Sequence, residues 1–354
     1  MKEIIIADIR TNTLAGVVTG HFVYLAKLYQ KIFSKKCVVK VAGGPAYLKS
    51  FSETELLLLP YNINGTTIKD KINSFRNCKR LFREAAGKTI ILQQSSVVTA
   101  FVAIALFYCG KSKLLMIQYS NAGVSNLVKR FIYYLAKKSI DGVICPNENV
   151  GKAYGLPYIV VPDYIYIGDA DFPSIPFREK QYDFCIIGRL SHEKGVPNVI
   201  KFLKKTDYKV LIAGKPQNEA LGEEIRKECE GAANIELHLG YINDEDYLRY
   251  IQQSRYSVLN YQGEYSVRSS GVVYDMLFNG TPVVGCRCSA LKFIEEKGLG
   301  LIYDDINNID FPRLMDVEFY NWCQKNIVEY RKSHQQYKEK LIKFILGNNN
   351  ATNE

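Results

Sequence analysis

The sequence predicts an α/β protein made of two parallel-sheet domains in tandem. Short apolar segments alternate with helical patterns through both halves of the chain, as expected when helices connect parallel strands. A chain of 354 residues also exceeds the length at which a single hydrophobic core usually stops growing. A proline-rich interruption separates the two series. We therefore expect two Rossmann-like domains that face each other across a ligand-binding cleft, and a long C-terminal helix.

The first half contains six short apolar segments that are predicted to be strands, because strands covered by helices on both faces are apolar nearly throughout. They are residues 4–7, 37–41, 56–59, 89–92, 114–117 and 142–145. Helical periodicity predicts helices over residues 20–33, 70–86 and 125–138. The longest apolar run, residues 97–109, is shorter than the roughly 20 residues of a membrane-spanning helix and is interpreted as a buried helix.

Prolines and aspartates interrupt this pattern over residues 159–176, which we interpret as a linker. The second series of predicted strands comprises residues 184–187, 209–213, 235–237, 256–259, 282–284 and 301–303. Its predicted helices are residues 196–204, 218–229, 244–252, 272–278, 291–296 and 318–346. The expected domains are residues 1–165 and 166–325, with residues 326–354 forming a helix and tail that pack back towards the N-terminal domain. Residues 348–354 are expected to fray.

The positive charge lies almost entirely in the first half of the chain. Residues 1–170 contain 22 Lys and Arg against 10 Asp and Glu, whereas residues 171–354 contain 24 against 26. This asymmetry suggests an anionic partner, either nucleic acid or an acidic membrane surface, with ordinary solvation as the alternative. Residues 128–138 form an amphipathic basic pattern that fits either packing on the first sheet or contact with anionic lipid. No nucleic-acid module is recognisable, so nucleic acid is not an expected partner.

The nine cysteines show no zinc-site spacing and are interpreted as reduced thiols of a cytosolic protein. The residues that follow Met1 lack the features of a signal peptide. We therefore expect a cytoplasmic location, with association with the inner face of the cell membrane as a further expectation.

The first motif with chemical content is the segment from Gly188 to Gly195, which directly follows a predicted strand. Its glycines allow the backbone to approach a diphosphate closely. Arg189 and Lys194 can neutralise the charge that develops on a departing nucleoside diphosphate. The alternative is a basic surface turn.

The second motif begins where a helix is expected to start, at Ser270, Gly271 and Val272. Backbone amides at a helix start favour phosphate oxygens. Asp275 lies one turn further on, where it can accept hydrogen bonds from a ribose diol. The alternative is that Ser270 only caps the helix and that Asp275 is solvated.

Together these segments resemble the GT-B-fold glycosyltransferases, most closely the retaining family 4 group (glycosyl transferases group 1). The resemblance rests on Gly-Arg-Leu-x-x-x-Lys-Gly and, roughly 70 residues later, Ser-Gly-Val-Val-x-Asp-x-x-x-x-Gly-x-Pro-Val-Val, and it is specific over about residues 182–305. It implies that Gly188, Arg189 and Lys194 bind the donor diphosphate. It also implies that Ser270, Gly271 and Val272 meet that diphosphate and that Asp275 binds ribose.

One position departs from the family pattern. Family members commonly carry two glutamates with seven residues between them, but counting back eight positions from Asp275 gives Val267. The resemblance implies that Glu264 takes this place near the donor sugar, with a catalytic role. Arg268 is expected to contact the donor or its phosphates.

The loop after the first strand contains Gly16, Thr19, Gly20 and His21, and lacks the glycine spacing of a dinucleotide site. The resemblance implies that this loop touches the donor sugar or the acceptor. Many relatives have a histidine where this chain has Gln118, which can bond a sugar hydroxyl but cannot act as a base.

The expected activity is transfer of a sugar, as in a hexosyltransferase, from a nucleoside-diphosphate sugar to a hydroxyl of a glycan acceptor. The family's habit and the basic first half suggest a lipid-linked acceptor in capsule or O-antigen synthesis, a retaining mechanism and UDP as the donor nucleotide. No acidic pair has metal-binding spacing, so no metal and no cofactor are expected. A non-catalytic nucleotide-sugar binding protein, a nucleotide-sugar epimerase of the same fold and a nucleic-acid binder remain as alternatives.

Overall fold

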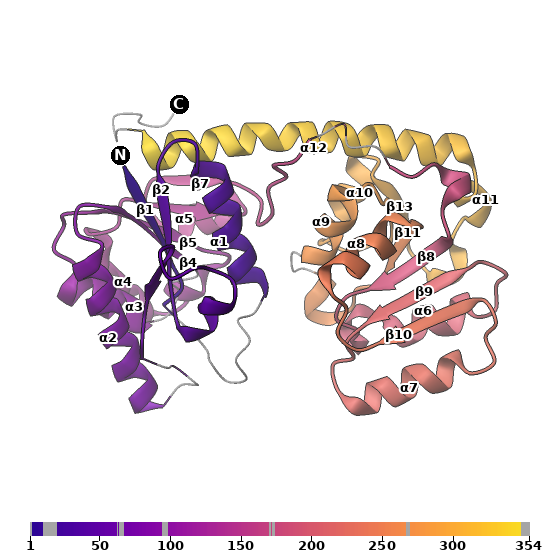
Figure 1. The fold of residues 1–354 in the computed structure, drawn as a ribbon, viewed down its shortest axis with the longest axis horizontal. Coiled ribbons are helices and arrows are strands. Elements are labelled where there is room, and N and C mark those ends of the chain that lie inside the picture. The colour runs from indigo at the N-terminus through magenta and orange to yellow at the C-terminus, as the bar shows by residue number, and fades with distance from the viewer. Residues whose placement is uncertain are drawn as a thin grey trace. The chain divides into compact units, whose positions relative to one another are not determined.

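The computed structural model describes residues 2–9, 20–61, 63, 67–93, 98–169, 171, 174–266 and 270–347. The chain divides into two compact units. One unit comprises Met1–Ile167 with Gln336–Glu354, and the other comprises Gly168–Gln335. Each unit contains one parallel β-sheet with helices on both faces, and Figure 1 labels their elements. This confirms the predicted α/β class.

The sheet of the first unit has the strand order β3-β2-β1-β4-β5-β6-β7. Its strands are β1 (Glu3–Ala7), β2 (Val38–Gly43), β3 (Leu56–Leu58), β4 (Thr89–Gln93), β5 (Lys113–Ile117), β6 (Gly142–Cys145) and β7 (Tyr158–Val160). β1 lies at the centre, where Ile4 pairs with Val39 on one side and with Thr89 on the other. The interpretation of residues 159–176 as linker was wrong at its start, because β7 includes Ile159 and Val160. β7 has only three residues, all half-buried, so its apolar signal is weak.

Two cores cover the two faces of this sheet. The helices on one face are α2 (Ile68–Glu84), α3 (Val98–Phe107), α4 (Leu127–Lys137) and α5 (Glu148–Tyr154). The other face is covered by α1 (Gly20–Phe33) and by the C-terminal end of α12 (Val317–Leu346), which buries Leu341 and Ile345. Lys113 Nζ donates to the carbonyl oxygens of Phe344 (2.9 Å) and Ile345 (3.1 Å), which fixes the end of α12 to this unit.

The sheet of the second unit has the order β10-β9-β8-β11-β12-β13, with all pairs parallel. Its strands are β8 (Tyr182–Ile187), β9 (Val210–Gly214), β10 (Ile235–Leu239), β11 (Ser254–Leu259), β12 (Val283–Cys286) and β13 (Gly300–Tyr303). The order reverses between β8 and β11, and in open parallel sheets ligands bind beyond the carboxyl ends of strands at such a point.

Helices again cover both faces of the second sheet. The residues of one core come from α6 (Val196–Leu203), α7 (Glu219–Cys229), α11 (Phe311–Leu314) and the start of α12. Those of the other core come from α8 (Asp244–Gln252), α9 (Gly271–Phe278) and α10 (Lys292–Glu296). Asparagine side chains accept hydrogen bonds from the first turns of α7 and α8, so these helices start where the sequence places a capping residue.

Candidate functional site

Glycines shape the loop that follows β8. Gly188 has φ +98°, so the chain turns sharply at the carboxyl end of the strand. Ser191 caps the short helix over His192–Lys194, accepting a hydrogen bond from the Lys194 amide at 3.3 Å. Gly195 has φ +64°, and a Cβ there would lie 2.3 Å from the carbonyl oxygen of Asn260. The absence of that Cβ lets the loop lie directly against the segment that follows β11.

Gly188 also meets two other segments of the second unit. A Cβ on Gly214, at the end of β9, would lie 1.7 Å from the carbonyl oxygen of Gly188. A Cβ on Gly188 would lie 3.2 Å from Cγ2 of Val272, in the first turn of α9. The ends of β8 and β9 and the start of α9 are therefore packed together at backbone level.

Lys194 is the half-buried cation of this loop. Its pKa is lowered to about 8, first by burial and then by the charge of Arg189, and the charge of Asp275 opposes this shift. Arg189 is exposed. The fold thus holds two cations close enough to repel each other, an arrangement that an anion bound between them would stabilise.

Asp275 lies in α9 and accepts a hydrogen bond from the hydroxyl of Tyr247 in α8, at 3.0 Å. The pKa of Asp275 is raised to about 6, because the effect of burial exceeds the opposing effects of the Tyr247 hydrogen bond and the charge of Lys194. The carboxylate is therefore mostly ionised at pH 7 and is held between a phenol and an ammonium group. It is not the solvated helix residue of the alternative interpretation.

The start of α9 has no side-chain cap. Ser270 occupies the N-cap position, but its hydroxyl accepts a hydrogen bond from Tyr261 at 2.6 Å and makes no capping bond. The first amides of any helix lack partners within the helix, and the helix dipole adds partial positive charge there. Gly271 and Val272 therefore present amides suited to an anion.

A groove of about 910 Å³ opens beside Gly188 and Arg189. It is lined by the segments that follow β8, β9 and β10, and by Tyr247 of α8. Lys215, Gln217 and Tyr241 line it, and Tyr241 is 86% exposed. These residues were not among those predicted from the sequence. A signal was present, because Gly214-Lys215 and Gly240-Tyr241 follow strands as Gly188-Arg189 does.

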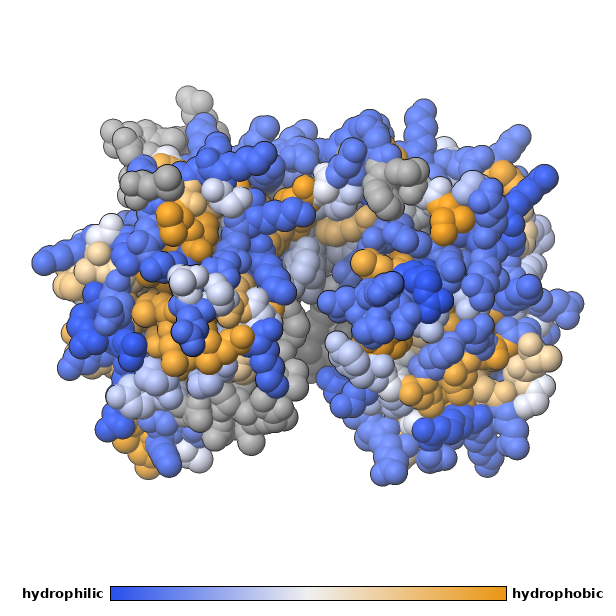
Figure 2. Space-filling model, viewed as in Figure 1, coloured by the Kyte–Doolittle hydropathy of each residue, from blue (hydrophilic) through white to orange (hydrophobic). Residues whose placement is uncertain are grey.

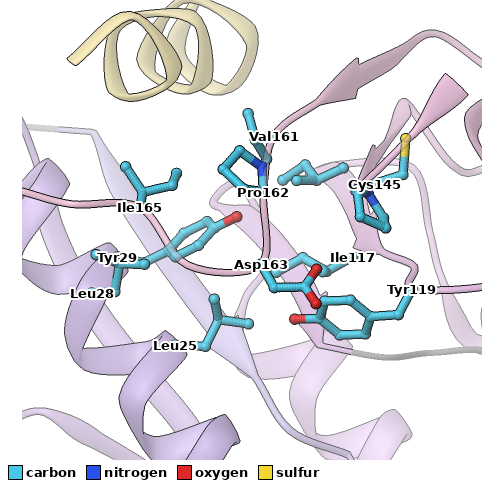
Figure 3. Close-up of a pocket in the computed structure, with 12 residues that line it drawn as sticks. Leu25, Leu28, Tyr29, Ile117, Tyr119, Cys145, Val161, Pro162, Asp163 and Ile165 are labelled. Atoms are coloured by element: carbon cyan, nitrogen blue, oxygen red, sulfur yellow. The ribbon is translucent and has the colours of Figure 1, made fainter. Parts of the chain in front are cut away.

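In the first unit, Gln118 directly follows β5 and is fully buried. Its Nε2 lies 3.8 Å from Sδ of Met116, a residue of the core beneath α2 to α5. Next to it, Tyr119 and Asp163 face a narrow apolar pocket between α1 and the ends of β5 and β6 (Figure 3). Burial and the charge of Asp163 raise the pKa of Tyr119. This pocket is too narrow to admit a sugar ring.

Several predicted site residues fall outside this description. Gly16, Thr19, Val267 and Arg268 lie outside the described residues. Gly20 begins α1, and His21 follows it there. Glu264 lies in a short 3₁₀ helix over Gly263–Ser266. The side chains of His21 and Glu264 are not among those described.

The other predicted residues of the second unit lie close together at the end of β8 and the start of α9. They are Gly188, Arg189, Lys194, Ser270, Gly271, Val272 and Asp275.

The remaining predicted features concern metals, thiols and membrane spans. No three His, Cys, Asp or Glu side chains form a metal-binding group in the described part of the chain. All nine cysteines are free thiols, and Cys109 is exposed. Among the described helices, none combines the length and the apolar character needed to cross a bilayer.

Residues 169–309 match the family model of the Glycosyl transferases group 1. This range includes the loop after β8, the groove beside it and the start of α9. No curated protein sequence is detectably similar to the chain. Solved structures match it over nearly its full length. The chain has the GT-B fold.

Three of these structures illustrate the likeness. A glycosyltransferase involved in avilamycin A biosynthesis is 13% identical with a TM-score of 0.60, covering 98% of this chain and 99% of that one. A lipopolysaccharide outer core galactosyltransferase in its apo form is 14% identical with a TM-score of 0.62, covering 97% and 99%. A pneumococcal O-GlcNAc transferase in complex with UDP and GlcNAc is 10% identical with a TM-score of 0.64, covering 98% and 99%. The structural likeness establishes the GT-B fold, and at identities this low it establishes the fold alone.

Proposed function

We propose that this GT-B protein is a glycosyltransferase that moves a sugar from a nucleoside-diphosphate sugar to a hydroxyl of a glycan acceptor. The observation that carries the proposal is the convergence of Lys194, Arg189 and the uncapped start of α9 at the end of β8. These groups are all donors or cations, and they meet beside a groove. The match of residues 169–309 to a glycosyltransferase family supports the same activity.

The chemistry required is stabilisation of a leaving group. The bond between the anomeric carbon and the diphosphate oxygen breaks, and a bond to the acceptor oxygen forms. The acceptor proton passes to the departing phosphate oxygen, on the face from which the diphosphate leaves, so configuration is retained. Lys194 and Arg189 neutralise the charge that grows on the diphosphate, and the amides of Gly271 and Val272 bind its oxygens. This set of groups performs the transfer without a metal.

We assign the nucleoside to the groove after β8, β9 and β10. Tyr241 offers an exposed ring on which a base can stack. Asp275, oriented by the hydroxyl of Tyr247, binds the ribose diol. Glu264 and Arg268 remain our candidates for contacts with the donor sugar, and Gly16, Thr19, Gly20 and His21 for the acceptor side. Gln118 is fully buried and is therefore not assigned to the acceptor. We take UDP as the donor nucleotide.

The acceptor in this proposal is linked to a lipid diphosphate, in assembly of a surface polysaccharide such as capsule or O-antigen. The support is the basic first half of the chain, since a cationic surface favours an anionic carrier and an acidic membrane. The protein then works as a peripheral protein at the inner face of the cell membrane.

Thermal unfolding in the presence of UDP, GDP, dTDP, CMP, NAD and a short RNA tests the proposed donor site. One nucleoside diphosphate at about 100 times its Kd is expected to stabilise the native state by about 2.7 kcal/mol and to raise the Tm by a few degrees. A response to RNA or NAD alone, with no response to any diphosphate, would contradict the proposal. Sugar transfer from the corresponding donor then separates an enzyme from a non-catalytic binding protein.

Nucleotide affinity is expected to depend on pH through Lys194. In the free protein this ammonium has a pKa of about 8, and a bound diphosphate favours its charged form. Binding therefore takes up a proton above pH 8, and affinity falls as pH rises. Titration calorimetry should show a loss of about tenfold between pH 7 and pH 9. Lys194→Arg keeps its charge throughout this range and is expected to show a flat profile. Equal slopes for both proteins would remove Lys194 as the source.

A further inference from the structure

The outward face of α4 is apolar, the reverse of what a surface helix usually shows. Five apolar side chains of this helix are more than half exposed: Leu127 (83%), Val128 (68%), Phe131 (65%), Tyr134 (66%) and Leu135 (54%). Only Tyr133 and Ala136 of the helix are buried. The amphipathic pattern of residues 128–138 is compatible with an apolar stripe that packs on the sheet or with one that faces outward. The structure shows that much of it faces outward.

The apolar surface continues onto the neighbouring helix. α3 packs along α4, and its Leu106 is 67% exposed. Figure 2 shows hydrophobic side chains reaching the surface of the first unit, which is otherwise largely hydrophilic. Single exposed apolar residues are ordinary, but a cluster on adjacent helices marks an interaction surface.

The charge around this surface has one sign. Arg130 on α4 and Lys138 directly after it are exposed, and no ion pair in the described part of the chain involves either of them. The sequence contains no Asp or Glu between Glu84 and Asp141, a stretch that includes all of α3 and α4. The apolar face is therefore bordered by cations, and α3, α4 and the segment between them contribute no acidic residue.

We propose that the outward face of α4 docks onto an anionic bilayer. Leu127, Phe131 and Leu135 enter the boundary between headgroups and acyl chains, and Arg130 and Lys138 contact anionic headgroups. A second copy of this chain fits less well, because a symmetric contact would bring two sets of these cations together. The inference gives a definite surface to the membrane contact and rests on that part of the proposed function.

Cosedimentation with vesicles tests the surface directly. The probes are phosphatidylcholine vesicles with and without about one third phosphatidylglycerol. The triple variant Leu127→Ser, Phe131→Ser and Leu135→Ser removes apolar groups that are already exposed, so the fold is expected to persist. Its partition coefficient on anionic vesicles should fall by at least about tenfold. The matched control, Val38→Ser with Leu48→Ser, changes residues 44% and 46% exposed elsewhere on the same unit and should bind as wild type does.

The double variant Arg130→Gln with Lys138→Gln separates the electrostatic part of the binding. It should weaken binding to anionic vesicles at low salt and converge with wild type at high salt, because screening removes the same contribution. Equal binding by wild type and the triple variant would overturn the proposal. So would a wild type that binds no vesicle and forms a dimer, with the triple variant a monomer in sedimentation velocity.

The same proteins distinguish this inference from the donor proposal. Every α4 variant should keep the thermal response to a nucleoside diphosphate, since its changes lie outside residues 169–309. Vesicle binding without any nucleotide response would contradict the donor site alone. A nucleotide response without vesicle binding would contradict the α4 surface alone.

Discussion

Lys194→Ala is expected to lower turnover by about 10³-fold while the protein stays folded. The half-buried ammonium is the group best placed to meet charge that develops on a leaving diphosphate. Its pKa of about 8 shows that the folded protein disfavours the charged form when no anion is bound. Removing the ammonium therefore removes an unfavourable interaction from the free protein and removes stabilisation from the transition state. Steady-state kinetics and a thermal melt on the same preparation measure both effects.

Lys201→Ala is the matched control, because Lys201 lies in the next helix with its side chain 52% exposed and pairs with Glu228. It should leave turnover unchanged. Full activity of Lys194→Ala, with Arg189→Ala also active, would remove the leaving-group assignment. A large fall in Tm with a proportionate loss of activity would show that Lys194 acts structurally.

The regular elements were largely predictable because buried parallel strands are short runs that are apolar nearly throughout, and the helices between them show an apolar period of about 3.6 residues. The predicted helix at residues 20–33 and the predicted strand at 142–145 coincide with α1 and β6. The elements that were missed are short. One of them, α5, contains Gly151, which in a sequence suggests the end of a helix. A Cβ at this position would lie 2.4 Å from the ring of Tyr158. The glycine is therefore explained by close packing against β7 and does not end the helix.

The candidate site was predictable only where its residues lie close together in the sequence. Arg189 and Lys194 belong to one loop, and Ser270, Gly271 and Asp275 belong to one helix start. Tyr247 was not found because only the placement of β8 beside β11 brings α8 next to α9. The outward face of α4 was not decided by periodicity either, because a period of 3.6 identifies an apolar stripe but not the side on which the sheet lies.

Gly214→Ala is expected to destabilise the second unit by more than about 4 kcal/mol and to abolish the response to nucleoside diphosphate. Gly214 has φ +153°, and its Cβ would lie 1.7 Å from the carbonyl oxygen of Gly188. The obstructing atom is backbone at the ends of two adjacent strands, so no side-chain rotation relieves the overlap. Either β9 or the loop from Gly188 must move, and Lys194 moves with that loop.

Urea unfolding monitored by far-UV circular dichroism measures the loss, with Gly231→Ala as the control. Gly231 has φ +73° with nothing within 4 Å of an added Cβ, so its substitution costs only the left-handed conformation, about 1–2 kcal/mol. Gly214, at φ +153°, lies outside the left-handed region that Gly231 adopts at φ +73°. The difference between the two variants therefore reports the steric contact between Gly214 and Gly188 together with the larger backbone strain at Gly214. Similar denaturation midpoints and an intact nucleotide response in both variants would mean that the ends of β8 and β9 tolerate separation. The loop geometry assigned to the diphosphate site would then be wrong.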